Sequence, residues 1–294
     1  MHIPVLLDEV LKYLDVQPGK IIIDGTLDGG GHAFAIAEKV TPNGKVYGIE
    51  ADPVMFQEIT QKIGESPYAG HIIPIHDSYV HLESVCERYG VQPDGILFDF
   101  GLSSWHYEQS GRGFSFMRDE PLDMRFNPAT GQSAAEIVNS YSEPELEKIL
   151  IDYGEEQFAE SIAESIVLER RKAPIMTTFR LVEVISGVVP NWYKHRKIHY
   201  ATKTFQALRV AVNEELENVK KGVEAAIRAV KPGGRIVVIS FQGLEDKIVK
   251  ETFKKYVKEN IITLTYKGTI KPTWEERKRN PRSRSAKMKV AQKL

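Results

Sequence analysis

Four short apolar runs, each ending in turn residues, recur through the first hundred positions of the chain. Hydrophobic residues fill them almost continuously instead of alternating with polar ones, which is typical of parallel strands buried on both faces. Stretches with helical spacing lie between them, and a further helical stretch opens the chain after Pro4. The alternation predicts an α/β fold with a doubly wound, mostly parallel sheet. The predicted strands are residues 20–26, 45–50, 71–76 and 95–100, and the first predicted helices between them are residues 32–40 and 54–63.

The alternation breaks after Gly101, and no strand-like run is obvious before Gly233. Helical patterns take its place, and the longest predicts one helix from Phe205 to Val230. A buried strand is predicted at residues 235–241, with antiparallel closing strands at 261–267 and 287–292. The other helices are predicted at residues 133–139, 143–152 and 155–171. We therefore predict a sheet domain of residues 1–108 and 205–294, interrupted by an inserted all-α domain of residues 109–204.

The composition is that of a soluble globular protein, with 42% apolar and 27% charged residues. The single cysteine, Cys86, excludes an internal disulfide and a multi-cysteine zinc or iron–sulfur site, and it fits a reducing cytoplasm. The apolar runs are far shorter than the roughly 20 residues of a membrane helix, and the N-terminus lacks the basic region of a secretory signal. We expect a cytoplasmic protein with no membrane partner and no metal.

The net charge of −1 hides an uneven distribution. Residues 267–294, which include Arg282 and Arg284, hold ten Lys and Arg against two Glu, so this tail carries +8 and the remaining chain −9. A second basic segment, the loop of residues 190–204, contains Lys194, Arg196 and Lys197 and no acid. Such segments indicate local contact with a polyanion, although a solvated tail would have the same composition.

A glycine-rich turn, residues 24–32, follows the first predicted strand and opens a helix. A phosphate-binding P-loop would need Lys-Ser/Thr where His32 and Ala33 stand, and a dinucleotide fingerprint would need a small residue in place of Phe34. S-adenosylmethionine remains, since it has a carboxylate and a ribose diol but no phosphates. Glu50, twenty residues after Gly30, ends the second predicted strand and is expected to bind that ribose. The glycines alone would also fit a turn without a ligand.

Asp99 ends the fourth apolar run, and ligands of open sheets lie outside the carboxyl ends of the strands. A carboxylate there can accept a hydrogen bond from an exocyclic amine, align it and stabilise the positive charge that develops on nitrogen. The alternative is that Asp99 caps a turn with Ser103 or Ser104.

An aromatic and arginine-rich loop, residues 111–127, supplies candidates for binding single-stranded RNA. Interdomain packing would explain the same composition. His195 and His199 have helical spacing but no accompanying acid, which argues against a metal site. The RNA candidates of this loop are Arg112, Phe114, Phe116, Arg118 and Arg125.

Several longer strings run from the start of the chain to its tail. They are His2-Ile-Pro-Val-Leu-Leu-Asp-Glu9, Arg112-Gly-Phe-Ser-Phe-Met-Arg-Asp119, Pro121-Leu-Asp-Met-Arg125, Gly131-Gln-Ser-Ala-Ala-Glu136, Thr204-Phe-Gln-Ala-Leu-Arg209, Ile239-Ser-Phe241, Leu244-Glu-Asp246 and Asn280-Pro-Arg-Ser-Arg-Ser285. On these strings the chain closely resembles the bacterial 16S ribosomal-RNA (cytosine-N4)-methyltransferase family.

The resemblance implies a class I, Rossmann-like methyltransferase whose helical insert recognises the substrate. It implies S-adenosylmethionine-dependent methylation of the 4-amino group of a cytidine in the decoding centre of 16S rRNA, with the small ribosomal subunit as partner. The family's pattern places seven residues against the methyl donor: Gly30, Gly31, His32, Glu50, Tyr79, Asp99 and His106.

Three positions depart from the family's usual pattern. Asp28 stands where glycine is common, Glu50 where aspartate is common, and Gln242-Gly243 replace His-Ser. Two alternatives stay open: a methyltransferase for another nucleic acid amine or a protein side chain, and a non-catalytic assembly factor that binds S-adenosylmethionine. Asp99-Phe-Gly-Leu lacks the Pro-Pro-aromatic motif of many DNA amine methyltransferases, so DNA is not expected.

Overall fold

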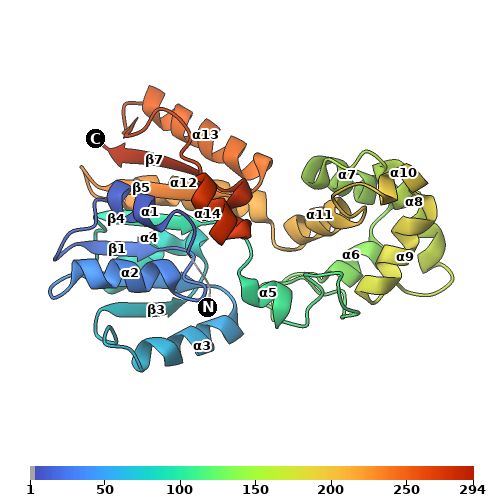
Figure 1. Ribbon diagram of the computed structural model, residues 1–294, viewed down its shortest axis with the longest axis horizontal. Coiled ribbons are helices and arrows are strands. Elements are labelled where there is room, and N and C mark those ends of the chain that lie inside the picture. Colours follow the sequence, from blue (N-terminus) through green and yellow to red (C-terminus); the bar gives the residue numbers. More distant parts are fainter. Residues whose placement is uncertain (1–3) are drawn as a thin grey trace. The chain divides into compact units, whose positions relative to one another are not determined.

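The computed structural model describes residues 4–294, so His2 and Ile3 of the first string lie outside the described residues. The chain forms two compact units, Met1–Gly101 with Leu216–Leu294, and Leu102–Glu215. The first contains a seven-stranded sheet in the order β3-β2-β1-β4-β5-β7-β6 (Figure 1). The strands are β1 (Ile21–Asp24), β2 (Lys45–Glu50), β3 (Ile72–His76), β4 (Gly95–Asp99), β5 (Arg235–Ser240), β6 (Ile262–Leu264) and β7 (Lys287–Lys293).

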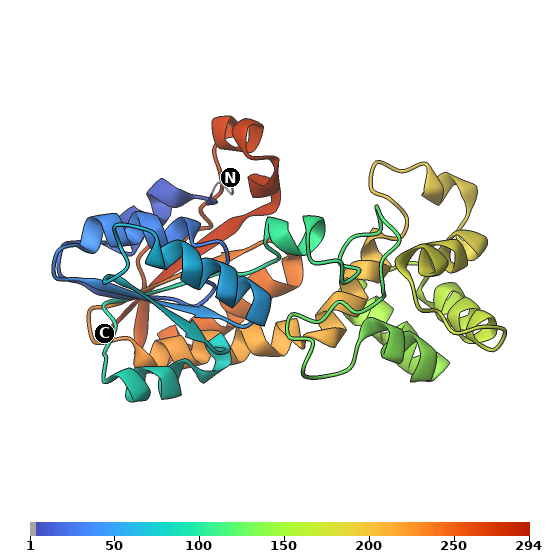
Figure 2. The same cartoon turned by 90° about the horizontal axis from the view of Figure 1, so that it is seen from below.

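The pairing confirms the predicted fold class. Strands β1 to β5 pair in parallel, while β7 runs antiparallel to both β5 and β6. Helices cover both faces of the sheet (Figures 1 and 2). On one face pack α1 (Leu7–Tyr13), α2 (Gly31–Val40) and α3 (Pro53–Gly64), and on the other α4 (Leu82–Tyr89), α12 (Glu215–Ala229) and α13 (Gly243–Lys258).

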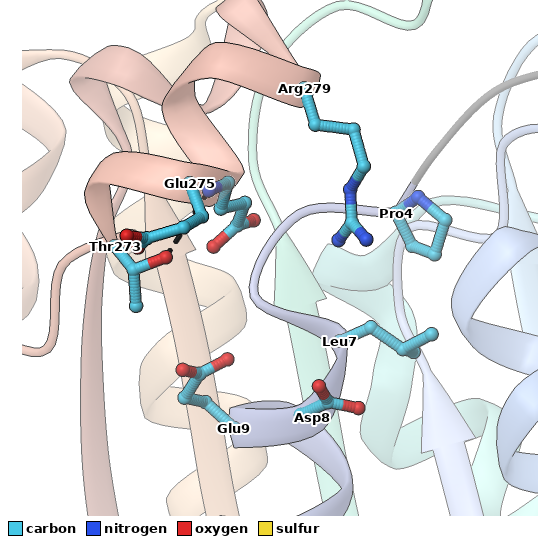
Figure 3. Close-up of a pocket in the computed structure, with 8 residues that line it drawn as sticks. Pro4, Leu7, Asp8, Glu9, Thr273, Glu275 and Arg279 are labelled. Atoms are coloured by element: carbon cyan, nitrogen blue, oxygen red, sulfur yellow. Dashed lines mark hydrogen bonds between the residues drawn. The ribbon is translucent and has the colours of Figure 1, made fainter.

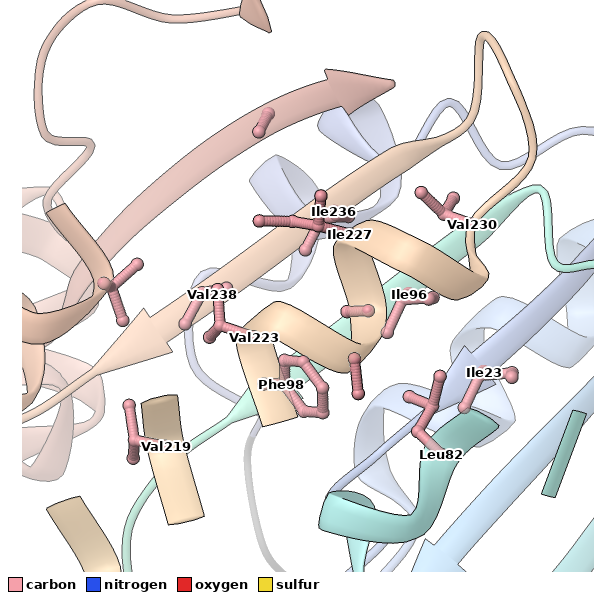
Figure 4. Packing of buried hydrophobic residues seen from close by; sticks show 14 of the residues in the cluster. Ile23, Leu82, Ile96, Phe98, Val219, Val223, Ile227, Val230, Ile236 and Val238 are labelled. Carbon is pink, nitrogen blue, oxygen red and sulfur yellow. The ribbon is translucent and has the colours of Figure 1, made fainter. Parts of the chain in front are cut away.

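Branched and aromatic side chains fill the layer between the sheet and α4, α12 and α13 (Figure 4). Phe98 of β4 is fully buried there, and its ring stacks on Phe100 at 5.2 Å between centroids. The same ring explains Gly25, because a Cβ at that position would lie 2.3 Å from Phe98 Cε1. Cys86 is buried in this layer as a free thiol.

The strand order reverses between β1 and β4, since β2 and β3 lie on one side of β1 and β4 and β5 on the other. Open α/β sheets bind their ligands in the crevice outside the carboxyl ends of the strands at such a reversal. Strands β1, β2 and β4 end at Asp24, Glu50 and Asp99. Three carboxyl side chains therefore mark the edge at which a ligand is expected.

The second unit is helical and has its own core. Local signals define some of its helices: Ser133 with Glu136 and Ser142 with Glu145 form capping boxes at the starts of two of them. Helix α9 has an N-cap, Thr177, but the sequence analysis did not predict it. The helices are α5 (Ser104–Glu108), α6 (Ala134–Ser140), α7 (Glu143–Gly154), α8 (Ala159–Arg170), α9 (Thr178–Val188), α10 (Asn191–Lys194) and α11 (Thr202–Val212).

The prediction of one helix from Phe205 to Val230 was wrong. The chain turns at Glu214, whose φ is +49°, and this turn separates α11 from α12. The Asn213 side-chain amide donates to the carbonyl of Met124 at 2.8 Å, and the Arg209 guanidinium pairs with Glu215 at 2.7 Å. The apolar spacing continues through the break because α11 packs on α7 and α12 packs on the sheet.

Because this helix break was missed, the predicted domain boundaries differ from the boundaries of the two compact units. Predicted boundaries lie at 108/109 and 204/205, whereas the compact units meet at Gly101/Leu102 and Glu215/Leu216. Helix α11 contributes Phe205, Ala207 and Leu208 to the helical core, so it belongs to the insert. None of the helices in residues 4–294 is both long and apolar enough to cross a membrane.

Candidate active site

The glycine-rich turn leaves β1 at Asp24 and enters α2 through left-handed backbone. Gly30, the residue before α2, has φ of +78°, and its N–H donates to the carbonyl of Leu27 at 2.8 Å. Asp28, which departs from the family's usual glycine, has φ of +44°, so the left-handed turn is retained. No atom lies within 4 Å of a Cβ built on Gly29. A ligand can therefore approach the Cα of this residue closely, while its carbonyl accepts a hydrogen bond from Lys62 Nζ at 2.8 Å.

Glu50 ties this turn to the end of β2. Its carboxylate accepts the N–H of Asp28 at 2.9 Å and the N–H of Asp52 at 2.8 Å, and the residue is buried. Burial raises the pKa of Glu50 to about 7, although these two donors lower it. Each carboxylate oxygen has a second lone pair, so Glu50 can hold the turn and still accept hydrogen bonds from a diol.

Asp24, His32 and Asp99 meet at the ends of β1 and β4. The His32 Nε2 lies 3.3 Å from Asp99 Oδ2, and the N–H of Asp99 donates to Thr26 Oγ1 at 2.7 Å. Asp24 Oδ2, both ring nitrogens of His32 and Asp99 Oδ1 are buried without a hydrogen-bond partner among residues 4–294. Together with Leu27, Asp28 and Gly31, these side chains line a small crevice.

Burial shapes the ionisation of this group. It raises the pKa of Asp24 to about 7, and burial with the neighbouring Glu50 raises the pKa of Asp28 well above its ordinary value. For His32, burial lowers the pKa, but the adjoining Asp99 carboxylate outweighs it, so the net pKa is raised. The sequence analysis did not single out Asp24; its signal is a charged residue at the end of a buried strand.

The partnerless oxygens and the excess of carboxyl groups define the kind of ligand that fits. Phosphates would be repelled, whereas a ligand with positive charge and several N–H or O–H donors would pair the buried oxygens. S-adenosylmethionine has such groups in its ammonium, its sulfonium and its ribose diol. The residues present therefore fit this methyl donor better than a dinucleotide or nucleoside triphosphate.

Tyr79 lies on a short 3₁₀ segment (Tyr79–His81) after β3. Its ring packs at 5.6 Å from Phe98 and 5.4 Å from Phe100, and it lies over Gly222 of α12. A Cβ at Gly222 would come within 2.5 Å of Tyr79 Cδ2. Gly222 thus makes room for the ring of Tyr79, which is predicted to contact the methyl donor, and the sequence analysis did not single Gly222 out.

Replacing Gly222 with alanine is expected to destabilise the sheet unit and weaken donor binding. The helix gains about 1 kcal/mol from alanine, but displacing Tyr79 costs about 1–3 kcal/mol, so the change is net unfavourable. Donor affinity measured by calorimetry should fall about 3- to 10-fold, because each factor of ten is about 1.4 kcal/mol. Gly187→Ala is the matched control: nothing lies within 4 Å of its Cβ, so that helix should gain stability. Unchanged donor affinity in Gly222→Ala would argue against Tyr79 as a donor contact.

His106 belongs to the helical unit. It is buried, its Nδ1 lies 2.9 Å from Ser103 Oγ, and its ring contacts Phe114 and Phe126, each at 5.2 Å. These contacts fix its ring but do not place it against the donor crevice. The expected donor contact of His106 stays a prediction.

The arginine-rich loop is held together by its own side chains. Arg112 donates to the carbonyls of Arg125 and Phe126 at 2.9 and 2.8 Å, and Arg125 forms a two-pronged pair with Asp123. Phe114 is only 6% exposed and stacks on Phe126, so its ring has no face open to a base.

The remaining candidates for RNA contact are more open. Arg118 keeps half of its side chain exposed beside Glu120. Phe116 is half-buried and stacks on His199 at 4.6 Å. Lys194 is half-buried, and the exposed cations are Arg196, Lys197, Arg282 and Arg284.

The basic tail packs on the N-terminal segment, which in turn lies against the glycine turn. Glu276 of α14 (Trp274–Arg279) accepts the N–H of Leu6 at 2.7 Å, and Pro4 lies against Gly31, 3.3 Å from the place of a Cβ there. The pocket beside this contact has a volume of about 410 Å³ (Figure 3). Its lining is Pro4, Leu7, Asp8, Glu9, Thr273, Glu275, Glu276 and Arg279. No local pattern reveals this contact, since 270 residues separate its partners.

The sequence profile of the MraW methylase family matches residues 1–294. The chain belongs to the MraW methylase family. A protein of Trichlorobacter lovleyi, named ribosomal RNA small subunit methyltransferase H, is 41% identical over 310 residues that cover 100% of this chain and 98% of the relative. Its namesake from Dictyoglomus thermophilum is 42% identical over 295 residues, which cover 100% of this chain and 97% of that relative. The matches confirm the family expected from the sequence. They also confirm the methyltransferase class and S-adenosylmethionine as the methyl donor.

Proposed function

We propose that this protein transfers the methyl group of S-adenosylmethionine to the exocyclic 4-amino group of a cytidine in the decoding centre of 16S rRNA. The family and the names of the relatives support a ribosomal RNA substrate. The observation that carries the proposed chemistry is Asp99 at the end of β4, with one buried oxygen open beside the donor crevice. The proposed substrate is the 16S rRNA of the small ribosomal subunit, and the proposed location is the cytoplasm.

S-adenosylmethionine, when bound, supplies an electrophilic methyl group. Asp99 Oδ1 accepts a hydrogen bond from the cytidine amine, aligns its lone pair and stabilises the positive charge that develops on nitrogen. Thr26 fixes the backbone of Asp99, and the His32 ring lies 3.3 Å from its other oxygen. Asp24 Oδ2 would accept from the donor's ammonium and Glu50 from its ribose.

The helical insert would recognise the RNA. An amine inside a paired helix cannot meet the methyl group, so the target base must be flipped or unpaired. The cations outside the donor crevice would contact the phosphates flanking that base. They are Arg118, Lys194, Arg196, Lys197, Arg282 and Arg284, with Phe116 as the remaining aromatic candidate of the loop 111–127. The RNA contacts expected of Arg112 and Arg125 stay predictions, because both side chains are engaged within the loop.

The test is incubation with labelled S-adenosylmethionine and small subunits from cells that lack the activity, followed by mass mapping of the modified nucleotide. We expect one labelled cytidine in the decoding centre. Subunits from cells that contain the activity are the matched control and should accept no label. Donor binding without label in RNA would instead indicate an assembly factor, and label at another amine would indicate a different substrate.

The raised pKa values of Asp24 and Glu50, each about 7 against ordinary values of 3.8 and 4.5, predict a pH-dependent donor affinity. Below pH 7 these carboxyls hold protons that a cationic donor must displace, so affinity should rise from pH 6 to pH 8 and protons should be released on binding. The same raised pKa values make the stability of the donor-free fold change with pH in the opposite direction. Between about pH 4 and 7 the folded chain binds more protons than the unfolded one, so its stability falls as pH rises.

Calorimetry in two buffers with different ionisation enthalpies would count the released protons. In Asp24→Asn the number released at pH 6 should fall, because asparagine does not titrate. The exposed change Asp152→Asn is the matched control and should leave it unchanged. Affinity that is flat from pH 6 to pH 8 would contradict the prediction.

A further inference from the structure

The basic segment of residues 190–204, which was expected to be a loop but contains α10 and the start of α11, carries a tryptophan that no part of the donor crevice uses. Trp192 of α10 is 59% exposed, an unusual state for so large an apolar side chain. Its ring is nevertheless supported by two others, Phe158 at 5.9 Å and Tyr193 at 5.7 Å between centroids. Both supporting rings are tilted steeply against the indole, at 60° and 81°. Trp192 is thus backed by protein while most of its surface faces solvent.

A buried carboxylate holds this aromatic group in place. Both oxygens of Glu156 lie within reach of the Tyr193 hydroxyl, which donates to them at 2.9–3.0 Å, and Glu156 also accepts the N–H of Phe158 at 3.0 Å. Glu156 and Tyr193 are each 3% exposed. Burial, with the hydrogen bond to Glu156, raises the pKa of Tyr193 to about 12, so its hydroxyl stays protonated. Hydrogen bonds to Glu156 therefore hold the two residues that support Trp192 in place before any ligand arrives, which lowers the entropy cost of binding.

The charged side chains of residues 190–204 are all basic. Arg196 and Lys197 are exposed, Lys194 is half-buried, and residues 190–204 contain no Asp or Glu. The Arg196 guanidinium lies 5.2 Å from the centre of the Tyr193 ring, so one cation is held directly beside the aromatic group. A partner that matches this surface has a flat apolar group flanked by negative charges. An unpaired nucleotide has both, whereas an apolar protein surface would leave three cations without partners.

We propose that Trp192 is a stacking platform for an unpaired base of the substrate RNA, with Lys194, Arg196 and Lys197 at the adjoining phosphates. The proposal rests on the proposed function, because it assumes an RNA substrate. It places one RNA contact at a defined residue of the helical unit.

The test compares Trp192→Ala and Trp192→Phe with wild type in binding to the small ribosomal subunit at several salt concentrations. Stacking of one base predicts a loss of about 5- to 150-fold in affinity for the alanine variant and recovery of most of it by phenylalanine. Because stacking neutralises no phosphate, the slope of log affinity against log salt should stay unchanged. The double variant Arg196→Gln, Lys197→Gln should instead make the fall of log affinity with log salt less steep, because it removes two phosphate contacts.

Phe179→Ala is the matched control, since Phe179 is a 45%-exposed aromatic of the same unit beside an arginine already paired with Glu169 and Glu183. It should change RNA affinity less than about 2-fold. Thermal unfolding and donor affinity of Trp192→Ala should match wild type, and turnover at saturating RNA should be unchanged while KM for RNA rises. RNA should also quench tryptophan fluorescence less in Trp192→Phe than in wild type.

Wild-type RNA affinity in a folded Trp192→Ala protein would overturn the proposal. A change in oligomeric state by light scattering, with RNA affinity retained, would show that the ring serves a protein interface and would overturn it as well. Failure of the proposed function is a separate result, because it appears as absence of methyl transfer by the wild-type protein.

Discussion

Asp99→Asn is expected to lower turnover about 10²–10³-fold while donor affinity changes far less. Asparagine has the size of aspartate, and the backbone N–H of residue 99 can still donate to Thr26 Oγ1. The negative charge opposite the amine is lost, so the charge that develops on nitrogen is no longer stabilised. The oxygen beside His32 loses its charge too, which should reduce donor affinity only modestly.

Single-turnover methylation at saturating donor and RNA separates the chemical step from binding. Asp152→Asn makes the same chemical change at an exposed position of α7 and should leave the rate unchanged. Thermal unfolding shows whether Asp99→Asn is folded. If donor affinity falls and the single-turnover rate does not, Asp99 is a donor ligand and its role toward the amine is wrong.

Features that depend on neighbouring residues could be predicted from the sequence. The strands follow from continuous apolar runs, and the carboxyl ends of parallel strands meet at one edge, so Glu50 and Asp99 could be placed in one site without coordinates. The left-handed turn at Asp28 could likewise be anticipated, because aspartate tolerates that conformation.

Features that depend on packing between distant segments could not be predicted from the sequence. Gly222 is explained only by the ring of Tyr79, and the acceptor for the N–H of Leu6 lies 270 residues away in Glu276. The helix break at Glu214 was missed because apolar spacing carries on through it, serving two different cores in turn. Phe114 illustrates the same limit, since a Phe in an Arg-rich loop has the same local pattern whether it is open to RNA or buried.

Glu50→Gln is expected to weaken donor binding about 10- to 100-fold, since hydrogen bonds to a charged group contribute about 1.5–3 kcal/mol. In the wild-type protein the Glu50 carboxylate accepts two backbone N–H groups, from Asp28 and Asp52. A glutamine has one acceptor oxygen, so its amide N–H would face one of these donors and leave it unpaired. The glycine turn would loosen, and the ribose would lose a charged acceptor.

Glu50→Asp distinguishes charge from reach, because it keeps the carboxylate but shortens the side chain by one methylene. We expect an intermediate loss, since aspartate cannot reach both backbone donors unless the turn moves. Glu251→Gln, an exposed change on α13, is the matched control and should leave donor affinity at the wild-type value. Calorimetry with S-adenosylmethionine measures all three affinities, and thermal unfolding reports the state of the fold. If Glu50→Gln binds the donor as tightly as wild type, Glu50 only fastens the turn, and the ribose must be held by other groups.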